Sequence, residues 1–384
     1  AISWQLSDSH GWGVFGLNLA LNLLDREGPR PFLLTEPNLL DTPAPVLDRL
    51  RPLIDEQRQI QAQVLDPAAG KTVGIGGAAV LHALVNGFNH HDTIRGDIDI
   101  GIIFYERGPI GDAERTRAGQ YDRIIAGSSW NRDYARAHGI DHIEFVSQGV
   151  DTSLFNPGPG SGAYAGRFTI FSGGKLEIRK GQDLVLAAFK IFHARHPDAL
   201  LITAWRNAWP ESAAGMVNSV HVETDPQVGP DGEIKIKEWA VANGVAADAF
   251  VDLGWVPNRQ TAAILRDMDV GLFPNRCEGG TNLVAMEAMA TGVPCVLSAN
   301  TGHLDLIGDN NCYALSDQRA ATEQGGPVEM WRESQVEEIV DTLEAIYTDR
   351  AEARRRAVRG SEFMADLCWA NQTARLMGAI EDLL

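Results

Sequence analysis

Two glutamates and two glycines, Glu278, Gly279, Gly280 and Glu287, lie close together in the later half of the chain. Residues 278–294 read EGGTNLVAMEAMATGVP, after a predicted strand that ends near Pro274. A helix is predicted to begin around Thr281 or Asn282, and the first turn of a helix offers free N–H groups and the positive end of its dipole to a diphosphate. Glu287, about a turn and a half into that helix, can accept hydrogen bonds from both hydroxyls of a ribose. The alternative interpretation is a loop glutamate followed by a solvated helix glutamate.

A short basic segment follows another predicted strand. Residues 174–181 read GKLEIRKG, directly after the strand-like FTIFSG. Gly174 would let the backbone approach a ligand closely, and the ammonium groups of Lys175 and Lys180 would neutralise phosphates as point charges, without the bidentate fork of an arginine. The alternative role of the two lysines is surface solubility.

The N-terminal region carries a second phosphate-binding pattern. Residues 11–16 read GWGVFG, a literal GxGxxG between a predicted strand at 1–6 and a predicted helix, and Glu36 ends the second predicted strand. In dinucleotide-binding folds these positions bind the pyrophosphate and the ribose, so an NAD-dependent oxidoreductase is an alternative function. Residues 7–10, SDSH, lengthen the turn before the first glycine. Because the fingerprint turns directly from strand to glycine, this insertion weighs against the oxidoreductase.

Further titratable side chains follow apolar segments of the first half. His90, His91 and Asp92 follow AVLHALVNGFN, and Glu106 ends the strand-like DIDIGIIFYE. We expect His90 and Glu106 to contact an acceptor at the ends of the strands, and His91 to take part in proton transfer with Asp92 as its partner. The alternative for the histidines is a polar loop without a chemical role.

Two other groups of polar residues have weaker implications. Asp97-Ile98-Asp99 forms a DxD pattern, which can bind a metal ion, but simple alternation along one strand explains it equally and we predict no metal site. His303 and Asp305 follow the predicted strand PCVLSA. We expect them to face a bound sugar or the gap between two lobes.

The order of the apolar segments places these residues on two α/β domains. Strand-like and helix-like segments alternate along both halves, which predicts parallel sheets covered by helices on both faces. Residues 149–167, GVDTSLFNPGPGSGAYAGR, are rich in Gly, Pro and Ser and form the predicted linker. We therefore predict a first domain at 1–155, a second domain at 156–365, and a terminal helix at 366–384 that packs back on the first domain.

Several of these segments resemble the donor-site motifs of the retaining GT-B glycosyltransferases of family 4, the glycosyl transferases group 1. The resemblance is carried by 278–294, by its continuation SANTGHLDLI, by 174–181, and by Gly254-Trp255-Val256-Pro257. It implies a GT-B fold, in which two Rossmann-like domains face each other across a cleft. It also implies transfer of a sugar, with retention, from a nucleoside diphosphate sugar such as a UDP- or GDP-sugar to a hydroxyl acceptor, with no cofactor and no metal ion.

The resemblance assigns roles to particular residues of this sequence. Catalysis is implied for Lys175, Lys180 and Glu278. Donor binding is implied for Gly11, Gly13, Gly174, Val256, Gly279, Gly280, Thr281, Asn282, Leu283 and Glu287. Two positions depart from the family: eight residues separate Glu278 from Glu287, where the family usually has seven, and Lys175 stands where the family has arginine. Either the loop carries one extra residue, or the role of Glu278 has passed to the backbone of Gly279 or Gly280.

The net charge of the chain limits the classes of partner that it is expected to bind. A formal net charge of −18 argues against a nucleic-acid partner, which would require clustered lysines and arginines. The first half shows no basic amphipathic face, so a soluble acceptor or a protein partner is favoured over docking on anionic lipid. No apolar run reaches the ~18–20 residues that span a bilayer. The four cysteines lack metal-binding spacing, so we expect buried thiols in the cytoplasm.

A non-catalytic sugar-nucleotide-binding scaffold and a nucleotide-sugar epimerase are further alternatives to the glycosyltransferase.

Overall fold

A computed structural model describes residues 1–90, 93–206, 210–323 and 326–384 of the chain. The chain forms two compact units. Unit 1 contains Ala1–Gly149, Gly279–Thr281 and Leu367–Leu384, and unit 2 contains Val150–Glu278 and Asn282–Asp366. The change from unit 1 to unit 2 at Gly149 coincides with the start of the Gly- and Pro-rich segment that was predicted to be a linker.

Unit 1 is built on a parallel sheet. Its strands lie in the order β1-β2-β3-β4, with bounds β1 (Val73–Leu84), β2 (Ile94–Ile103), β3 (Arg123–Ala126) and β4 (Ile143–Phe145). Ile2 forms parallel bridges to Leu81 of β1 and to Leu33. The predicted strands at 1–6 and 31–36 therefore extend the sheet only through isolated bridges. Proline at 31 and at 37 limits the second of them, because proline has no N–H to donate to a ladder.

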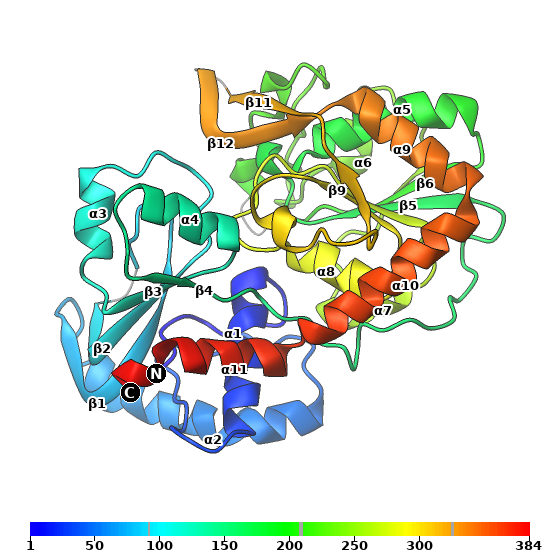
Figure 1. Cartoon of the computed structure of the whole chain (residues 1–384). Coiled ribbons are helices and arrows are strands. Elements are labelled where there is room, and N and C mark those ends of the chain that lie inside the picture. The colour runs from blue at the N-terminus through cyan, green and yellow to red at the C-terminus, as the bar shows by residue number, and fades with distance from the viewer. Residues whose placement is uncertain (91–92, 207–209, 324–325) are drawn as a thin grey trace. The chain divides into compact units, whose positions relative to one another are not determined.

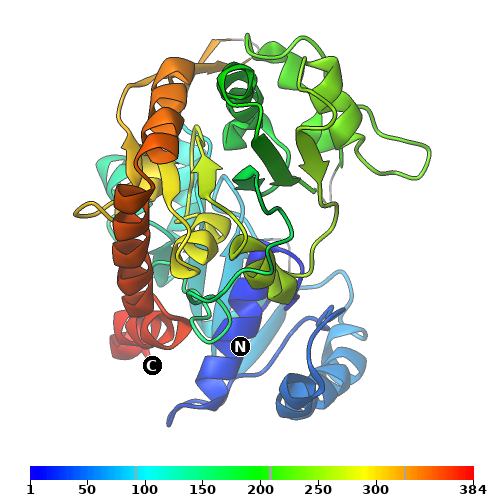
Figure 2. The ribbon, with the colours of Figure 1, turned by 90° about the vertical axis from the view of Figure 1, so that its right-hand side faces the viewer.

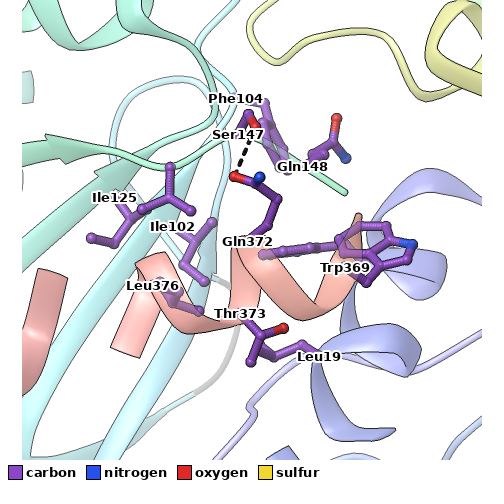
Figure 3. Close-up of a pocket in the computed structure, with 12 residues that line it drawn as sticks. Leu19, Ile102, Phe104, Ile125, Ser147, Gln148, Trp369, Gln372, Thr373 and Leu376 are labelled. Carbon is purple, nitrogen blue, oxygen red and sulfur yellow. Dashed lines mark hydrogen bonds between the residues drawn. The ribbon is translucent and has the colours of Figure 1, made fainter. Parts of the chain in front are cut away.

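Helices cover the sheet of unit 1, and the C-terminal helix is one of them (Figure 1). The helices are α1 (Gly11–Leu24), α2 (Ala44–Ile60), α3 (Asp112–Ala118), α4 (Ser129–Ala137) and α11 (Trp369–Ile380). α11 packs against α1, where the rings of Trp369 and Phe15 have centroids 5.7 Å apart. The Oγ of Ser147 donates a hydrogen bond of 3.0 Å to Gln372 of α11 beside a small apolar cavity (Figure 3).

Unit 2 contains a six-stranded parallel sheet. The strands are β5 (Phe168–Gly173), β6 (Ala199–Ala204), β7 (Phe250–Asp252), β8 (Val270–Phe273), β9 (Cys295–Ser298) and β10 (Tyr313–Leu315). They lie in the order β10-β9-β8-β5-β6-β7, so the order of the strands along the chain reverses between β5 and β8. In an open parallel sheet, ligands bind at the carboxyl ends of the strands at such a point.

The helices of unit 2 lie on both faces of its sheet (Figures 1 and 2). They are α5 (Gln182–Arg195), α6 (Ile236–Ala242), α7 (Asn258–Leu265), α8 (Leu283–Ala290), α9 (Val336–Thr348) and α10 (Arg350–Asp366). α5 and α9 share one hydrophobic core with β5, β6 and β8. An antiparallel hairpin of β11 (Gln318–Glu323) and β12 (Gly326–Ser334), absent from the sequence prediction, precedes α9. Among the described residues, no helix is long and apolar enough to cross a bilayer.

Candidate functional site

Two loops of unit 2 meet where the strand order reverses. The loop after β5 contains the basic segment 174–181, and the loop after β8 leads into α8. Gly181 has φ of +72°, and a Cβ atom at this position would lie 2.3 Å from the carbonyl oxygen of Pro274. The N–H of Arg276 donates to the carbonyl oxygen of Arg179 at 2.7 Å. A glycine at 181 therefore allows the two loops to touch, which brings their charged side chains together.

Lys180 and Glu278 form a buried ion pair across these loops. The Nζ of Lys180 lies 2.6 Å from Oε1 of Glu278, and Arg179 lies 3.3 Å from Oε2. The side-chain amide of Asn275 donates a further hydrogen bond to Glu278. Burial alone would raise the pKa of Glu278, but the charges of Lys180 and Arg179 lower it to about 2. Glu278 is therefore an ionised carboxylate held between cations.

The remaining charges of the basic loop are unevenly placed. Arg179 is buried and donates to the carbonyl oxygen of Cys277 at 2.7 Å, so it supports the loop after β8. Lys175 is exposed, and its carbonyl oxygen accepts a hydrogen bond of 2.6 Å from Gln182. Burial raises the pKa of Glu177, but Arg179, Lys180 and Lys175 together hold it below its ordinary value. The loop after β5 therefore presents a net positive field at the carboxyl end of the sheet.

Helix α8 begins at Leu283, directly after the position predicted from the sequence. Its N-cap residue is Asn282, whose side-chain oxygen accepts from the N–H of Ala285. The first helical hydrogen bond runs from Met286 N–H to the Asn282 carbonyl oxygen at 3.0 Å. In the part of the chain that the structure describes, the N–H groups of Leu283 and Val284 have no acceptor. They remain available to an anion at the positive end of the helix dipole.

Glu287 lies in the second turn of α8 and is buried. Its Oε1 accepts a hydrogen bond of 2.6 Å from the side-chain amide of Asn258, the first residue of α7. Burial raises the pKa of Glu287 to about 8, an effect that Asn258 opposes and Asp151 reinforces. Asn258 directly follows Gly254-Trp255-Val256-Pro257, where Val256 is half-buried. The hydrogen bond from Asn258 to Glu287 therefore connects the residue predicted to bind the ribose with the end of the segment predicted to contact the base.

The N-terminal glycine pattern has a different setting from the predicted one. α1 begins at Gly11, so the glycines lie inside a helix rather than in a loop. The N–H of Gly13 donates to Nδ1 of the N-cap residue His10 at 3.1 Å. A Cβ atom at Gly13 would lie 2.3 Å from that of Ser7, so glycine permits close packing of the helix on the preceding segment. The loop interpretation was wrong for this packing reason, while the proposed donor contacts of Gly11 and Gly13 stay a prediction.

The predicted acceptor residues lie in unit 1, except for those outside the described part of the chain. His91 and Asp92 lie outside the described residues. Nδ1 of His90 lies 2.5 Å from the hydroxyl of Tyr121, and the His90 ring stacks on that of His82. Glu106 follows β2, where its N–H donates to Asn86 at 2.8 Å. These contacts give His90 a structural partner and leave its role toward an acceptor a prediction.

The DxD aspartates bind groups of the protein itself. Oδ2 of Asp97 accepts from the N–H of Gly77 at 2.7 Å. Asp99 lies 2.8 Å from Nε2 of His82 and accepts from the N–H of Gly96 at 2.9 Å. Over the described ranges, no group of three or more His, Cys, Asp or Glu side chains is arranged to hold a metal ion.

Sequence reasoning missed a buried arginine beside the site. The guanidinium of Arg276 pairs with both carboxylate oxygens of Asp183, at 2.8 and 2.6 Å, and with Glu333 of β12 at 2.7 Å. Its Nη1 also donates to the carbonyl oxygen of Ile178 at 2.6 Å. Arg276 therefore joins the loop after β8 to the loop after β5, the start of α5 and the hairpin. In the sequence, its position two residues before Glu278 was the feature that could have indicated a role for Arg276 in the site.

Comparison with known proteins identifies related sequences. The family model described as "Glycosyl transferases group 1" matches residues 159–360, more than half of the chain. A D-inositol 3-phosphate glycosyltransferase from Arthrobacter sp. (strain FB24) is 26% identical over 58% of this chain and 45% of its own length. A GDP-mannose-dependent alpha-(1-6)-phosphatidylinositol monomannoside mannosyltransferase from Mycobacterium tuberculosis is 25% identical over 66% of this chain and 60% of its own length. The chain thus spans about half the length of these curated relatives.

Solved structures resemble the chain over its whole length. Sucrose-phosphate synthase from Thermosynechococcus elongatus gives a TM-score of 0.63 at 15% identity, covering 100% of this chain and 98% of its own. HepE from Anabaena, in complex with UDP-glucose, gives a TM-score of 0.62 at 12% identity, covering 99% of this chain and 98% of its own. These likenesses confirm the predicted α/β fold of the GT-B class.

Proposed function

The chain belongs to the glycosyl transferases group 1 family, and from its site we propose that it is a retaining family 4 enzyme that uses a nucleoside diphosphate sugar. The observation that supports this proposal best is the meeting of a basic loop and the start of α8 at the carboxyl end of the unit 2 sheet. Two free N–H groups, at Leu283 and Val284, and the ammonium of Lys180 are the donors that a diphosphate requires.

The diphosphate would enter beside an existing ion pair. The ammonium of Lys180 neutralises the carboxylate of Glu278, at 2.6 Å. Phosphate oxygens at the start of α8 would share this ammonium, with Lys175 adding a second, exposed charge. Glu278 would then turn part of its hydrogen-bonding capacity toward a hydroxyl of the donor sugar. Gly174, Gly279, Gly280, Thr281 and Asn282 would supply the close backbone approach.

The nucleoside would lie beside Glu287 and the Val256 loop. Glu287 would lose its proton when the ribose binds, and its carboxylate would then accept from both ribose hydroxyls, with Asn258 holding its other side at 2.6 Å. HepE was solved with UDP and with UDP-glucose, while the name of the mycobacterial relative specifies GDP-mannose. Uridine and guanosine diphosphates are therefore the two donors to test first.

The proposed reaction breaks the bond between the anomeric carbon and the diphosphate oxygen and forms one from that carbon to the acceptor oxygen. The departing diphosphate collects negative charge, which Lys175, Lys180 and the free N–H groups of α8 would stabilise. The acceptor hydroxyl would attack on the same face and pass its proton to the departing phosphate oxygen, so retention needs no separate protein base. No cofactor or metal ion has a role in this scheme.

The acceptor is proposed to be a hydroxyl compound of glycan or glycoconjugate synthesis. The curated relatives are named for inositol phosphate and phosphatidylinositol mannoside acceptors. Within this chain, His90, His91 and Glu106 are the proposed acceptor contacts, of which His91 lies outside the described residues. We further propose a cytoplasmic location, in keeping with a nucleotide-sugar donor.

Two experiments separate this function from a sugar-nucleotide scaffold and from an NAD-dependent enzyme. A non-catalytic sugar-nucleotide scaffold would bind the donor without releasing nucleoside diphosphate, whereas a transferase hydrolyses some donor when acceptor is absent. An NAD-dependent enzyme is disfavoured, because the chain belongs to the glycosyl transferases group 1 family and residues 7–10 separate the strand-like segment 1–6 from the first glycine. Mass spectrometry of the purified protein for retained NAD, together with a donor-hydrolysis assay, distinguishes the three.

Lys180→Ala provides the direct test of the donor site. We expect the variant to lose most of the thermal stabilisation that UDP or GDP gives the wild type, and about tenfold or more in nucleotide affinity, because a charged hydrogen bond to phosphate is removed. Lys237→Ala, at an exposed position of α6, is the matched control and should bind as the wild type does. Unchanged nucleotide affinity in Lys180→Ala would show that the donor binds elsewhere.

A further inference from the structure

The loop between Glu278 and α8 has an uncommon backbone. Eight residues separate Glu278 from Glu287, and within this stretch Asn282 takes a left-handed conformation with φ 65° and ψ 88°. Thr301, which contacts the same loop, also has a positive φ, of 42°. Asparagine tolerates this region better than most residues, while a β-branched threonine does so only when its surroundings require it. Because such backbone conformations cost free energy, contacts from the surrounding structure must hold Asn282 and Thr301 in this geometry.

One short segment holds both ends of this loop. The Oγ1 of Thr301 accepts from the N–H of Glu278 at 2.8 Å, and the N–H of Gly302 donates to the Glu278 carbonyl oxygen at 3.0 Å. At the other end, the side-chain amide of Asn282 lies 3.0 Å from Nε2 of His303. Residues 301–303 thus fix the position of Glu278 relative to the start of α8.

The hydrogen bonds around His303 determine which ring nitrogen carries the proton. Oδ1 of Asn282 accepts from Ala285 N–H, so its Nδ2 donates to Nε2 of His303. Nδ1 then carries the proton and donates to Oγ of Ser298 at 3.1 Å, and that hydroxyl donates to the carbonyl oxygen of Asn275 at 2.6 Å. These hydrogen bonds form a continuous series from Asn282 through His303 and Ser298 to Asn275.

The state of His303 agrees with this assignment. His303 is fully buried, and burial lowers its pKa to about 4, although Glu278 opposes the shift. The imidazole is therefore neutral at pH 7 and can accept from Asn282. A neutral ring with its proton on Nδ1 permits only one orientation of the Asn282 amide, the one that caps α8.

We propose that His303 is a positioning residue of the donor site, which holds Asn282 so that the N–H groups of Leu283 and Val284 face the diphosphate. This inference rests on the proposed function. The cap occupies the N–H of Ala285 and leaves the two preceding N–H groups open. Without His303, the left-handed Asn282 would lose the contact that opposes its strain, and the first turn of α8 would lose its fixed direction.

The test compares diphosphate binding with nucleoside binding. Affinities of UDP, GDP, uridine and guanosine are measured for His303→Leu, which removes the acceptor, and His303→Gln, whose Oε1 can accept from Asn282 as Nε2 does. We expect His303→Leu to weaken the better diphosphate about tenfold and its nucleoside less than twofold. His303→Gln should recover most of the loss. His196→Leu is the control for loss of a histidine. His196 is the C-cap residue of α5, at the end of that helix far from the basic loop 174–181.

Asn282→Gly provides a second, independent variant. Glycine keeps the left-handed backbone but removes the cap and the contact to His303. It should reproduce the diphosphate-specific loss, and adding His303→Leu should weaken binding no further, because the two residues act in series. Melting temperatures of the ligand-free variants show whether each one is folded.

The outcomes separate this inference from the proposed function. If the wild type binds neither diphosphate, the proposed function fails and this inference fails with it. If the wild type binds and His303→Leu binds equally well, only the positioning role is wrong. An equal loss for diphosphate and nucleoside would assign His303 a general structural role and overturn the inference.

Discussion

At the scale of single residues, two buried glutamates of unit 2 are held in opposite charge states. Glu278 and Glu287 are 4% and 6% exposed. Glu278 has an ammonium and a guanidinium within 3.3 Å, and its pKa falls to about 2. Glu287 accepts from the neutral amide of Asn258, and burial, reinforced by the charge of Asp151, raises its pKa to about 8. The difference in neighbours, rather than in burial, separates a fixed negative charge from a protonated acid.

The raised pKa of Glu287 predicts a pH-dependent stability. The folded state keeps the proton up to about pH 8, while the unfolded chain loses it near the ordinary value of 4.5. The free energy of unfolding should therefore decrease as pH rises through this window and level off above it. Glu287→Gln carries no ionisable proton there, so it should be more stable than wild type by about 4 kcal/mol at pH 8.5 and by less than about 1 kcal/mol at pH 5.

Urea denaturation at the two pH values measures this difference. Glu238→Gln, at an exposed position of α6, is the control and should show no pH-dependent gain. Glu287→Gln should also lose nucleotide affinity, because the proposed ribose contact needs a carboxylate. A stability gain that is equal at both pH values would mean that Glu287 is ionised in the folded protein.

Spacing in the sequence predicted some site residues but not their partners. Lys180, Glu278 and Glu287 stand out because charged residues next to glycines at strand ends suit a diphosphate sugar. The pairing of Lys180 with Glu278 joins residues about a hundred positions apart, and only the sheet order brings them together. Arg276 and its partner Asp183 lacked a pattern of their own, because a buried ion pair is defined by the fold around it.

At the scale of elements, alternation along the chain predicted the sheets better than the connections. The strands β5, β8 and β9 of unit 2 are apolar and buried along their whole length, so their segments stand out, while the β11–β12 hairpin (QRAATE and GPVEMWRES) is polar and lacks a clear period. The GWGVFG motif matched a loop signature, yet all three of its glycines lie within α1. Glycine serves close packing as well as phosphate binding, and the motif alone does not distinguish the two uses.

The contact between the two donor loops predicts the effect of Gly181→Ala. The added Cβ would lie 2.3 Å from the Pro274 carbonyl oxygen, at a φ of +72°. The loops must separate, so we expect a loss of about 2–4 kcal/mol in stability together with weaker binding of UDP or GDP. Gly162→Ala has a similar φ, of +76°, with no atom within 4 Å, and isolates the cost of the backbone alone. If both variants lose the same stability and keep nucleotide affinity, the loop contact has no role in the donor site.

At the scale of the whole molecule, each unit is compact in space but is built from separate stretches of the sequence. Unit 1 is completed by the last eighteen residues of the chain, Leu367–Leu384. In unit 1, α11 places Trp369, Gln372 and Leu376 around a small cavity against β2 and α1 (Figure 3). The terminal helix is thus part of the core of unit 1, whereas the donor residues that we propose lie mainly in unit 2.

This division predicts that Leu376→Ala separates stability from donor binding. Leu376 is 2% exposed and already borders a cavity, so its truncation enlarges a space that the surroundings do not fill. We expect a loss of about 2–4 kcal/mol, faster amide hydrogen exchange in α1, β2 and α11, and an affinity for UDP or GDP within twofold of wild type. Arg375→Ala, the exposed neighbour on the same helix, should change none of these quantities. Two results would contradict this expectation: faster hydrogen exchange confined to β5 and β8, or a large loss of nucleotide affinity. Either would show that the substitution in α11 affects unit 2, so that α11 supports the donor unit instead.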